Sequence, residues 1–163
     1  VEVLAMHTPG HTPGSTSLLI DGQYLLTGDT LFVSGVGRPD LGAKAEEWAR
    51  LLYRTLFERM AALPDEVLIL PAHYASRAEM QPTGLVSITL REARVRNPIF
   101  QLRTEQEFLG YVLEHLPPQP PVYQEIRRAN LGQVELDAEH AVEVELGPNQ
   151  CAAVRPPGTS RSL

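Results

Sequence analysis

The sequence predicts an α/β fold, on the basis of three observations. Short apolar runs separated by tight turns fill the first thirty residues, which is typical of β-strands. An apolar pattern at helical spacing follows over residues 45–63. Another short apolar run, residues 67–70, comes directly after that pattern. This alternation of strand, helix and strand favours an α/β layer over an all-β sandwich.

Three strands are expected near the start of the chain, at residues 1–6, 15–20 and 23–27. Asp21-Gly22 separates the second strand from the third and is typical of a two-residue hairpin turn. Two Pro-Gly turns, at residues 9–10 and 13–14, separate the first strand from the second. The first thirty residues are therefore organised by turns that leave little freedom at the strand ends.

A helix is expected over residues 45–63, after a glycine-rich loop at 31–42. The apolar residues at helical spacing are Trp48, Leu51, Leu52, Leu56, Met60 and Leu63. Pro64-Asp65 ends this helix, and residues 67–70 form a short buried strand. Residues 71–74 then leave that strand as a turn.

The last third of the chain is predicted to be mainly helical. A helix over residues 88–96 stops before Pro98, because the residue before a proline disfavours the helical conformation. Thr104 and Glu107 form a capping-box pattern that opens a helix running to about His115. The remaining segments are a stiff connector at 117–121, a helix at 122–130, one or two strands within 134–146, and a mobile tail at 156–163.

The composition excludes several classes of function. A net charge of −6 argues against non-specific nucleic-acid binding, which needs a basic face. Apolar runs such as residues 67–70 are far too short to cross a bilayer. The single cysteine, Cys151, cannot form an internal disulfide and fits a reducing compartment. We therefore expect a cytoplasmic protein without a nucleic-acid or membrane partner.

Three polar side chains follow predicted strand ends and are candidate metal ligands. His11 lies between the two Pro-Gly turns, where a side chain can be held in a fixed position. Asp29 comes directly after the third strand, and His73 follows the strand at 67–70. Imidazole and carboxylate groups are ligands for zinc, iron and manganese. Three such placements at one edge of the sheet would make a metal site.

Structural interpretations also exist: a lone histidine such as His11 is more often a surface or core residue than a metal ligand. Asp29 can cap the turn that follows it instead of binding a metal. His7, at the end of the first strand, is interpreted as a structural histidine that makes a hydrogen bond. His115 and His140 are interpreted as structural or solvated.

Three further residues are candidates for contact with a substrate. Arg38 and Asp40 lie in the glycine-rich loop, where such residues can contact an anionic substrate. The alternative is an Arg–Asp pair that stabilises the loop itself, and the sequence leaves both open. Tyr74 lies beside His73 and can add a hydroxyl to the site, with packing as its alternative. Neither a P-loop nor a dinucleotide-binding glycine motif occurs.

These motifs resemble the metallo-β-lactamase superfamily, in its glyoxalase II and persulfide dioxygenase branch. The resemblance is carried by Thr-Pro-Gly-His-Thr-Pro-Gly at 8–14, Thr-Gly-Asp-Thr-Leu-Phe at 27–32 and Leu-Pro-Ala-His at 70–73. The loop at 35–41 is more similar to the persulfide dioxygenase and rhodanese-fused branch than to glyoxalase II. The segment Arg96-Asn97-Pro98 is similar to that branch as well. The resemblance covers roughly residues 1–132.

The resemblance implies an incomplete domain. Residues 1–85 would form the C-terminal half of an αββα sandwich, with a helical extension at 86–132 and strands and a flexible tail at 133–163. His11, Asp29 and His73 would be the metal ligands of this second half. The family's His-x-His-x-Asp-His motif lies upstream and does not occur in this chain. The missing ligands would come from an upstream half of the same polypeptide, and the isolated chain is expected to be inactive.

The resemblance also implies a cofactor and a substrate class. The cofactor would be one iron ion, or zinc, and the substrate a small thiol compound such as a glutathione derivative. Three functions stay open: oxidation of glutathione persulfide, hydrolysis of a thioester as in glyoxalase II, and a non-catalytic half domain that binds a partner or completes a fold. An isolated half sandwich exposes an apolar sheet face, which leaves a homodimer open.

Overall fold

The computed structural model of the chain describes residues 1–42, 44–74, 76–119, 123–145 and 152–153. They belong to two compact units. One unit comprises Val1–Leu116 together with the segment at 151–163, and the other is Pro117–Gln150. The segment limits predicted at residues 85 and 132 stay predictions.

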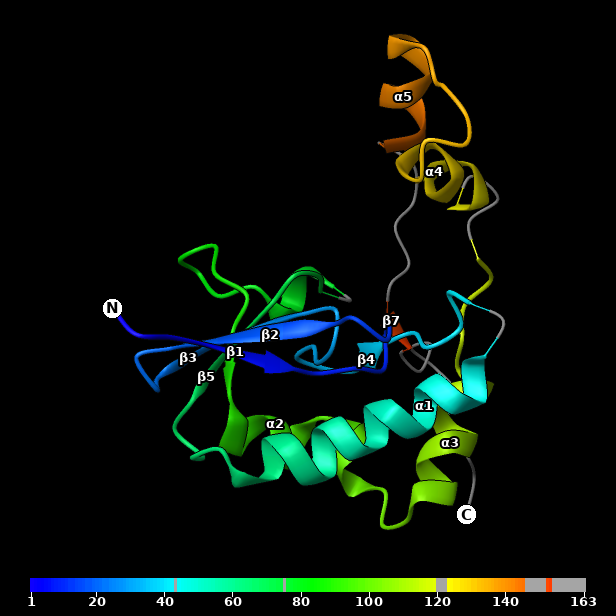
Figure 1. Cartoon of the computed structure of the whole chain (residues 1–163). Helices are drawn as coiled ribbons and strands as arrows, with labels where there is room; N and C mark the ends of the chain where they lie inside the picture. The colour runs from blue at the N-terminus through cyan, green and yellow to red at the C-terminus, as the bar shows by residue number, and fades with distance from the viewer. Residues whose placement is uncertain (43, 75, 120–122, 146–151, 154–163) are drawn as a thin grey trace. The chain divides into compact units, whose positions relative to one another are not determined.

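A five-stranded mixed sheet, in the order β1-β2-β3-β5-β6, is the centre of the first unit (Figure 1). Its strands are β1 (Val3–His7), β2 (Thr16–Ile20), β3 (Tyr24–Gly28), β5 (Leu68–Pro71) and β6 (Ile88–Thr89). Neighbouring strands are antiparallel, except that β3 and β5 run parallel. The four strands expected from the sequence are confirmed, each to within two residues at either end.

The turn between β2 and β3 shows why these strands pair as they do. Asp21 and Gly22 have positive φ angles of 48° and 67°, as a two-residue turn matching the strand twist requires. The turn sets Ile20 opposite Tyr24 and Leu18 opposite Leu26. Side chains on each strand therefore alternate between the two faces of the sheet in a fixed register.

The connection from β3 to β5 contains the long helix expected over residues 45–63. It begins as α1 (Ala45–Arg54), widens into a π-helical turn, η1 (Thr55–Arg59), and ends as a 3₁₀ turn, η2 (Met60–Ala62). The loop before it includes a two-residue strand, β4 (Val36–Gly37), which pairs with β7 (Ala152–Ala153). This pairing was not predicted from the sequence.

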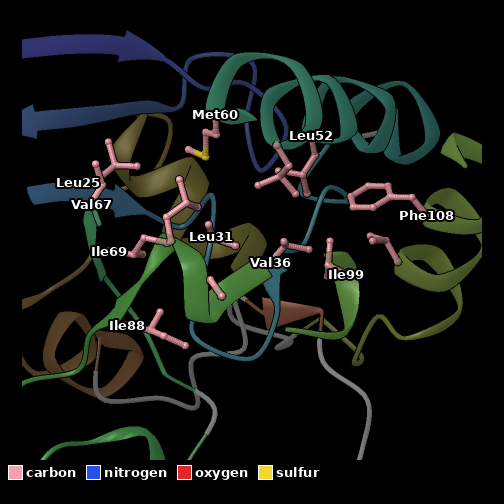
Figure 2. Close-up of a cluster of buried hydrophobic side chains, with 14 residues drawn as sticks. Leu25, Leu31, Val36, Leu52, Met60, Val67, Ile69, Ile88, Ile99 and Phe108 are labelled. Carbon is pink, nitrogen blue, oxygen red and sulfur yellow. The ribbon is translucent and has the colours of Figure 1, made fainter. Parts of the chain in front are cut away.

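One face of the sheet packs against the helices and forms the core (Figure 2). Leu25 from β3 and Ile69 from β5 are fully buried there, beside Leu52 of α1 and Met60 of η2. At the other end of the core, Phe108 of α3 (Glu105–Glu114) packs against the rings of Tyr53 and Phe57, and Phe57 also packs against Phe100. The apolar residues whose helical spacing predicted this helix thus lie on its buried face.

The opposite face of the sheet carries apolar side chains that stay partly exposed. Val3, Leu18, Tyr24 and Leu26 share this face, because the strand register places them opposite one another or two residues apart. Their exposed fractions are 55%, 36%, 43% and 37%. We call these four residues the open sheet face.

The last helices of the first unit follow the sequence signals closely. They are α2 (Leu90–Arg96), a 3₁₀ turn η4 (Pro98–Gln101) and α3 (Glu105–Glu114), with another 3₁₀ turn, η3 (Arg77–Glu79), ahead of them. Thr104 and Glu107 form the expected capping box of α3, and Thr89 and Glu92 form another on α2. The helix expected from residue 88 begins at Leu90, because Ile88 and Thr89 pair with β5 as β6.

The second unit contains α4 (Tyr123–Asn130) and α5 (Ala138–Glu145). The helix expected at 122–130 is confirmed, but the prediction of strands within 134–146 was wrong. Asp137 caps α5, since its carboxylate accepts a hydrogen bond from the backbone N–H of His140 at 2.8 Å. The helix-forming run that follows Asp137 outweighs the weak alternation. The predicted tail at 156–163 lies outside the described residues, as does part of the connector at 117–121.

Across the described ranges, every helix is too short or too polar to cross a membrane.

Candidate metal site

The sheet topology gathers His11, Asp29 and His73 at one edge. β1 and β3 run in the same direction, because each is antiparallel to β2, and β5 is parallel to β3. Asp29 follows β3 directly, His73 comes just after β5, and His11 lies on the turn after β1. The carboxyl ends of these strands therefore point the same way, and the expected convergence of the three residues is found.

The carboxylate of Asp29 lies between the two imidazoles. The Nε2 atom of His11 is 3.6 Å from the Oδ2 atom of Asp29, and the Nδ1 atom of His73 contacts Oδ1 of the same carboxylate. The ring of His73 also packs edge-on against Phe32, with the ring centroids 6.3 Å apart. Asp29 and His73 are partly exposed, whereas His11 is buried. The site thus opens to solvent on the His73 side.

The ring orientation of His11 is set by a backbone carbonyl. Nδ1 lies 2.9 Å from the carbonyl oxygen of Arg38. Because a carbonyl can only accept, Nδ1 carries the proton and Nε2 keeps its lone pair toward Asp29. Burial lowers the pKa of His11, and the nearby Asp29 carboxylate opposes this only in part. His11 is therefore held as a neutral imidazole, the form that binds a metal.

The donor atoms fit a metal ion. An ion held about 2.1 Å from each of two ligands sets them about 3.0–3.6 Å apart for angles between about 90° and 120°. The 3.6 Å between His11 Nε2 and Asp29 Oδ2 lies at the upper end of that range. In the part of the chain that the structure describes, no group of three or more His, Cys, Asp or Glu side chains is arranged to hold an ion by itself. His11 and Asp29 are thus the pair best placed as ligands.

Helix α1 and the π-helical turn η1 hold the turn that carries His11. Thr55 Oγ1 donates a hydrogen bond to the carbonyl of Pro9 at 2.7 Å. The backbone of Gly10 lies so close to the helix that a Cβ atom there would be 2.4 Å from Leu52 Cβ. On the other side, the buried hydroxyl of Thr8 contacts those of Ser17 and Thr30. The turn is therefore fixed from two directions.

Gly37 brings the glycine-rich loop against both ligand-bearing segments. A Cβ atom at this position would be 1.8 Å from the carbonyl oxygen of Asp29 and 3.0 Å from Cβ of His11. Sequence reasoning did not single out Gly37. The glycine spacing in the loop was the available signal, because a glycine is required wherever one backbone approaches another this closely.

Arg38 and Asp40, predicted to contact a substrate, form an ion pair with each other. Arg38 is 2% exposed, and its Nε and Nη2 atoms donate to Oδ1 and Oδ2 of Asp40 at 2.7 and 2.8 Å. The pair expected under the alternative interpretation is thus present. Tyr74 is 45% exposed next to His73. Substrate contact by Arg38, Asp40 and Tyr74 stays a prediction.

The other histidines take the structural roles expected of them. His7 Nε2 hydrogen-bonds the carbonyl of Pro13 at 2.7 Å, outside the site. His115 hydrogen-bonds the carbonyl of Tyr111 at the end of α3, and the partly exposed His140 lies 3.7 Å from Glu125 in the second unit. His11 is therefore the histidine that the His-Thr-Pro-Gly-His stretch contributes to the site.

The profile of the Metallo-beta-lactamase superfamily matches residues 1–73, the stretch that contains all three converging side chains. Residues 1–73, a little under half of the chain, are therefore similar to the metallo-β-lactamase superfamily. The mitochondrial persulfide dioxygenase ETHE1 of Mus musculus is 35% identical over 100 residues, which cover 61% of this chain and 35% of that protein. The probable metallo-hydrolase YqgX of Bacillus subtilis is 38% identical over 69 residues, 42% of this chain and 31% of that protein.

Two solved structures extend the similarity beyond the matched segment. A metallo-β-lactamase from Staphylococcus aureus has a TM-score of 0.70 and 29% identity over 82% of this chain and 41% of its own. ETHE1 from Myxococcus xanthus has a TM-score of 0.64 and 28% identity over 81% of this chain and 54% of its own. The fold is thus α/β and metallo-β-lactamase-like, with a helical C-terminal region. The chain spans about a third of the length of the curated relatives it matches.

Proposed function

We propose that this chain is part of a metal-dependent enzyme with the metallo-β-lactamase fold, which oxidises the terminal sulfur of glutathione persulfide. The observation that carries the metal site is the separation of 3.6 Å between His11 Nε2 and Asp29 Oδ2, with the other nitrogen of His11 held by a carbonyl. The named persulfide dioxygenases among the relatives, which are 35–37% identical, support the reaction.

Each residue of the site has a distinct role in this proposal. His11 and Asp29 hold one iron ion, and His73 is a third candidate ligand that also orients the Asp29 carboxylate by its contact with Oδ1. Bound iron would supply the dioxygen chemistry: dioxygen would accept the electrons that the terminal sulfur loses, dioxygen and water would provide the oxygen atoms of sulfite, and the S–S bond would break to release glutathione as its thiol. The partly exposed side of the site, next to His73 and Tyr74, is where a small thiol compound reaches it.

A thioester hydrolase of the glyoxalase II type is the second candidate. The similarity to a probable metallo-hydrolase, at 38% identity, favours it, and zinc would then replace iron. Metal-bound hydroxide is the nucleophile in such hydrolases. The same two ligands serve both reactions, so the metal and the reaction must be tested together.

The open sheet face supports the proposal that an upstream half of the same polypeptide completes the domain. Its four apolar side chains are 36–55% exposed, and contiguous apolar surface of this kind marks an interface. The solved relatives are about twice as long as the part matched by this chain. A half domain that only binds a partner, or a homodimer through this face, is the competing arrangement.

Metal content and oxygen uptake test these functions. The chain is purified without oxygen, alone and after co-expression with its upstream half, and its iron and zinc are measured. Iron together with oxygen uptake that depends on glutathione persulfide supports the dioxygenase. Zinc with thioester cleavage and no oxygen uptake refutes it in favour of the hydrolase. Activity that appears only with the upstream half supports completion of the domain, whereas one metal equivalent and full turnover by the chain alone refutes it.

A further inference from the structure

Arg38 is held tightly within the buried part of the glycine-rich loop. Its side chain is 2% exposed and makes two parallel hydrogen bonds with the Asp40 carboxylate, at 2.7 and 2.8 Å. Two-pronged contacts of this kind fix the relative orientation of both groups. A buried guanidinium without such a partner is strongly unfavourable, so the pair resists rearrangement.

The side chains of Arg38 and Asp40 meet across a single intervening residue, Pro39, and so close a ring. The proline ring fixes its own φ angle and keeps Arg38 out of the helical region. The side-chain clamp and the proline together leave the Arg38–Pro39 peptide with little freedom. The carbonyl of that peptide is the group that accepts the hydrogen bond from His11 Nδ1, at 2.9 Å.

The same segment also lies against the second ligand. Gly37, which precedes Arg38, is packed against the carbonyl of Asp29 and against His11 Cβ. A displacement of residues 37–40 would therefore move both donor atoms, Nε2 of His11 and Oδ2 of Asp29. Gly37 and Arg38 make these contacts through their backbone atoms.

We infer that the Arg38–Asp40 pair is a positioning device for the metal site: it holds the Arg38 carbonyl that fixes the proton of His11 on Nδ1 and turns Nε2 toward Asp29. This inference rests on the proposed metal site. Arg38 then acts on the metal through His11, and its guanidinium has no direct contact with the substrate. Groups that orient a ligand histidine in this way typically contribute about 10–100-fold in metal affinity.

Two variants of the full chain test the inference, with Zn²⁺ as the probe. Asp40→Asn keeps the shape of the side chain but removes its charge, and should weaken Zn²⁺ binding by about 10–100-fold in competition with a chromophoric chelator. In long-range ¹H–¹⁵N spectra of the metal-free chain, His11 should lose its single Nδ1–H tautomer. Arg38→Lys keeps the charge without the parallel hydrogen bonds, and should give a smaller loss of affinity.

A matched control separates positioning from general loss of stability. Arg94→Gln breaks another Arg–carboxylate pair, that of Arg94 with Asp65, which lies away from the site. It should lower the unfolding midpoint while leaving the Zn²⁺ affinity and the His11 tautomer unchanged. Circular dichroism is used to check that each variant is folded.

The inference is overturned if folded Asp40→Asn and Arg38→Lys keep the wild-type tautomer and Zn²⁺ affinity. It is also overturned if Arg38→Lys changes only the KM for persulfide in the completed enzyme, because that result places the guanidinium on the substrate. The proposed function fails separately, if the completed enzyme binds its metal without oxidising persulfide. The tautomer spectrum needs no metal, so it decides the positioning role in either case.

Discussion

Replacing Gly37 by alanine should damage both the metal site and the stability of the fold. The new Cβ atom would be 1.8 Å from the carbonyl oxygen of Asp29, and 3.0 Å is the shortest separation that real Cβ atoms show. The two backbones must therefore separate by 3.0 − 1.8 = 1.2 Å. Overpacking of this kind costs about 1–3 kcal/mol of unfolding free energy. The displaced atoms adjoin both His11 and Asp29, so Zn²⁺ affinity should fall by at least about tenfold as well.

The same substitution elsewhere in the chain provides the control. Gly110 lies on the exposed side of α3 with nothing within 4 Å of its would-be Cβ. Gly110→Ala should therefore raise the unfolding free energy by about 0.5–1 kcal/mol, the helix preference of alanine over glycine, and leave the metal affinity unchanged. Urea unfolding and Zn²⁺ competition measure both quantities. If Gly37→Ala matched the wild type in both, the close approach of loop and ligand would not be real.

Three other predictions concern the ligands and a helix cap. Asp29→Ala should abolish metal binding, because it removes the charged ligand, and wild-type metal stoichiometry would contradict the assignment. His7→Ala should keep most of the metal affinity that His11→Ala loses, since the His7 ring bonds the Pro13 carbonyl outside the site; equal losses in a chelator competition would show that both histidines are ligands. Thr104→Ala removes the cap of α3 and should cost about 1 kcal/mol in urea unfolding with unchanged metal binding; an unchanged midpoint would show that the cap contributes nothing.

The sequence was sufficient to predict those parts of the site that are determined by local turns and strands. Asp21-Gly22 fixes the hairpin because its φ angles allow only one kind of turn. The hairpin sets the direction of β3, and the intervening helix makes β5 parallel to it. Asp29 and His73 follow those two strands, so their meeting at one sheet edge could be expected from the order of strand, helix and strand alone.

Contacts between distant segments could not be predicted in this way. The pairing of Val36–Gly37 with Ala152–Ala153 joins segments more than a hundred residues apart, and two-residue strands have no periodicity to detect. The helix α5 was missed because its local sequence pattern was misleading. Its apolar residues alternate weakly, as in a strand, but the cap at Asp137 starts a helix instead.

For Arg38, the local sequence pattern does not determine the physical role of the side chain. An arginine in a glycine-rich loop next to a metal ligand has the same sequence signature whether it faces a substrate or a carboxylate. Burial distinguishes the two cases, because a substrate that drew the guanidinium away from Asp40 would leave a carboxylate without its partner. Breaking a fully buried pair typically costs about 3–5 kcal/mol, an upper limit for this part-buried pair, whereas one charge-assisted hydrogen bond to a substrate returns about 1.5–3 kcal/mol. We therefore expect the substrate to be recognised on the exposed side of the site, with Arg38 positioning His11 as inferred above.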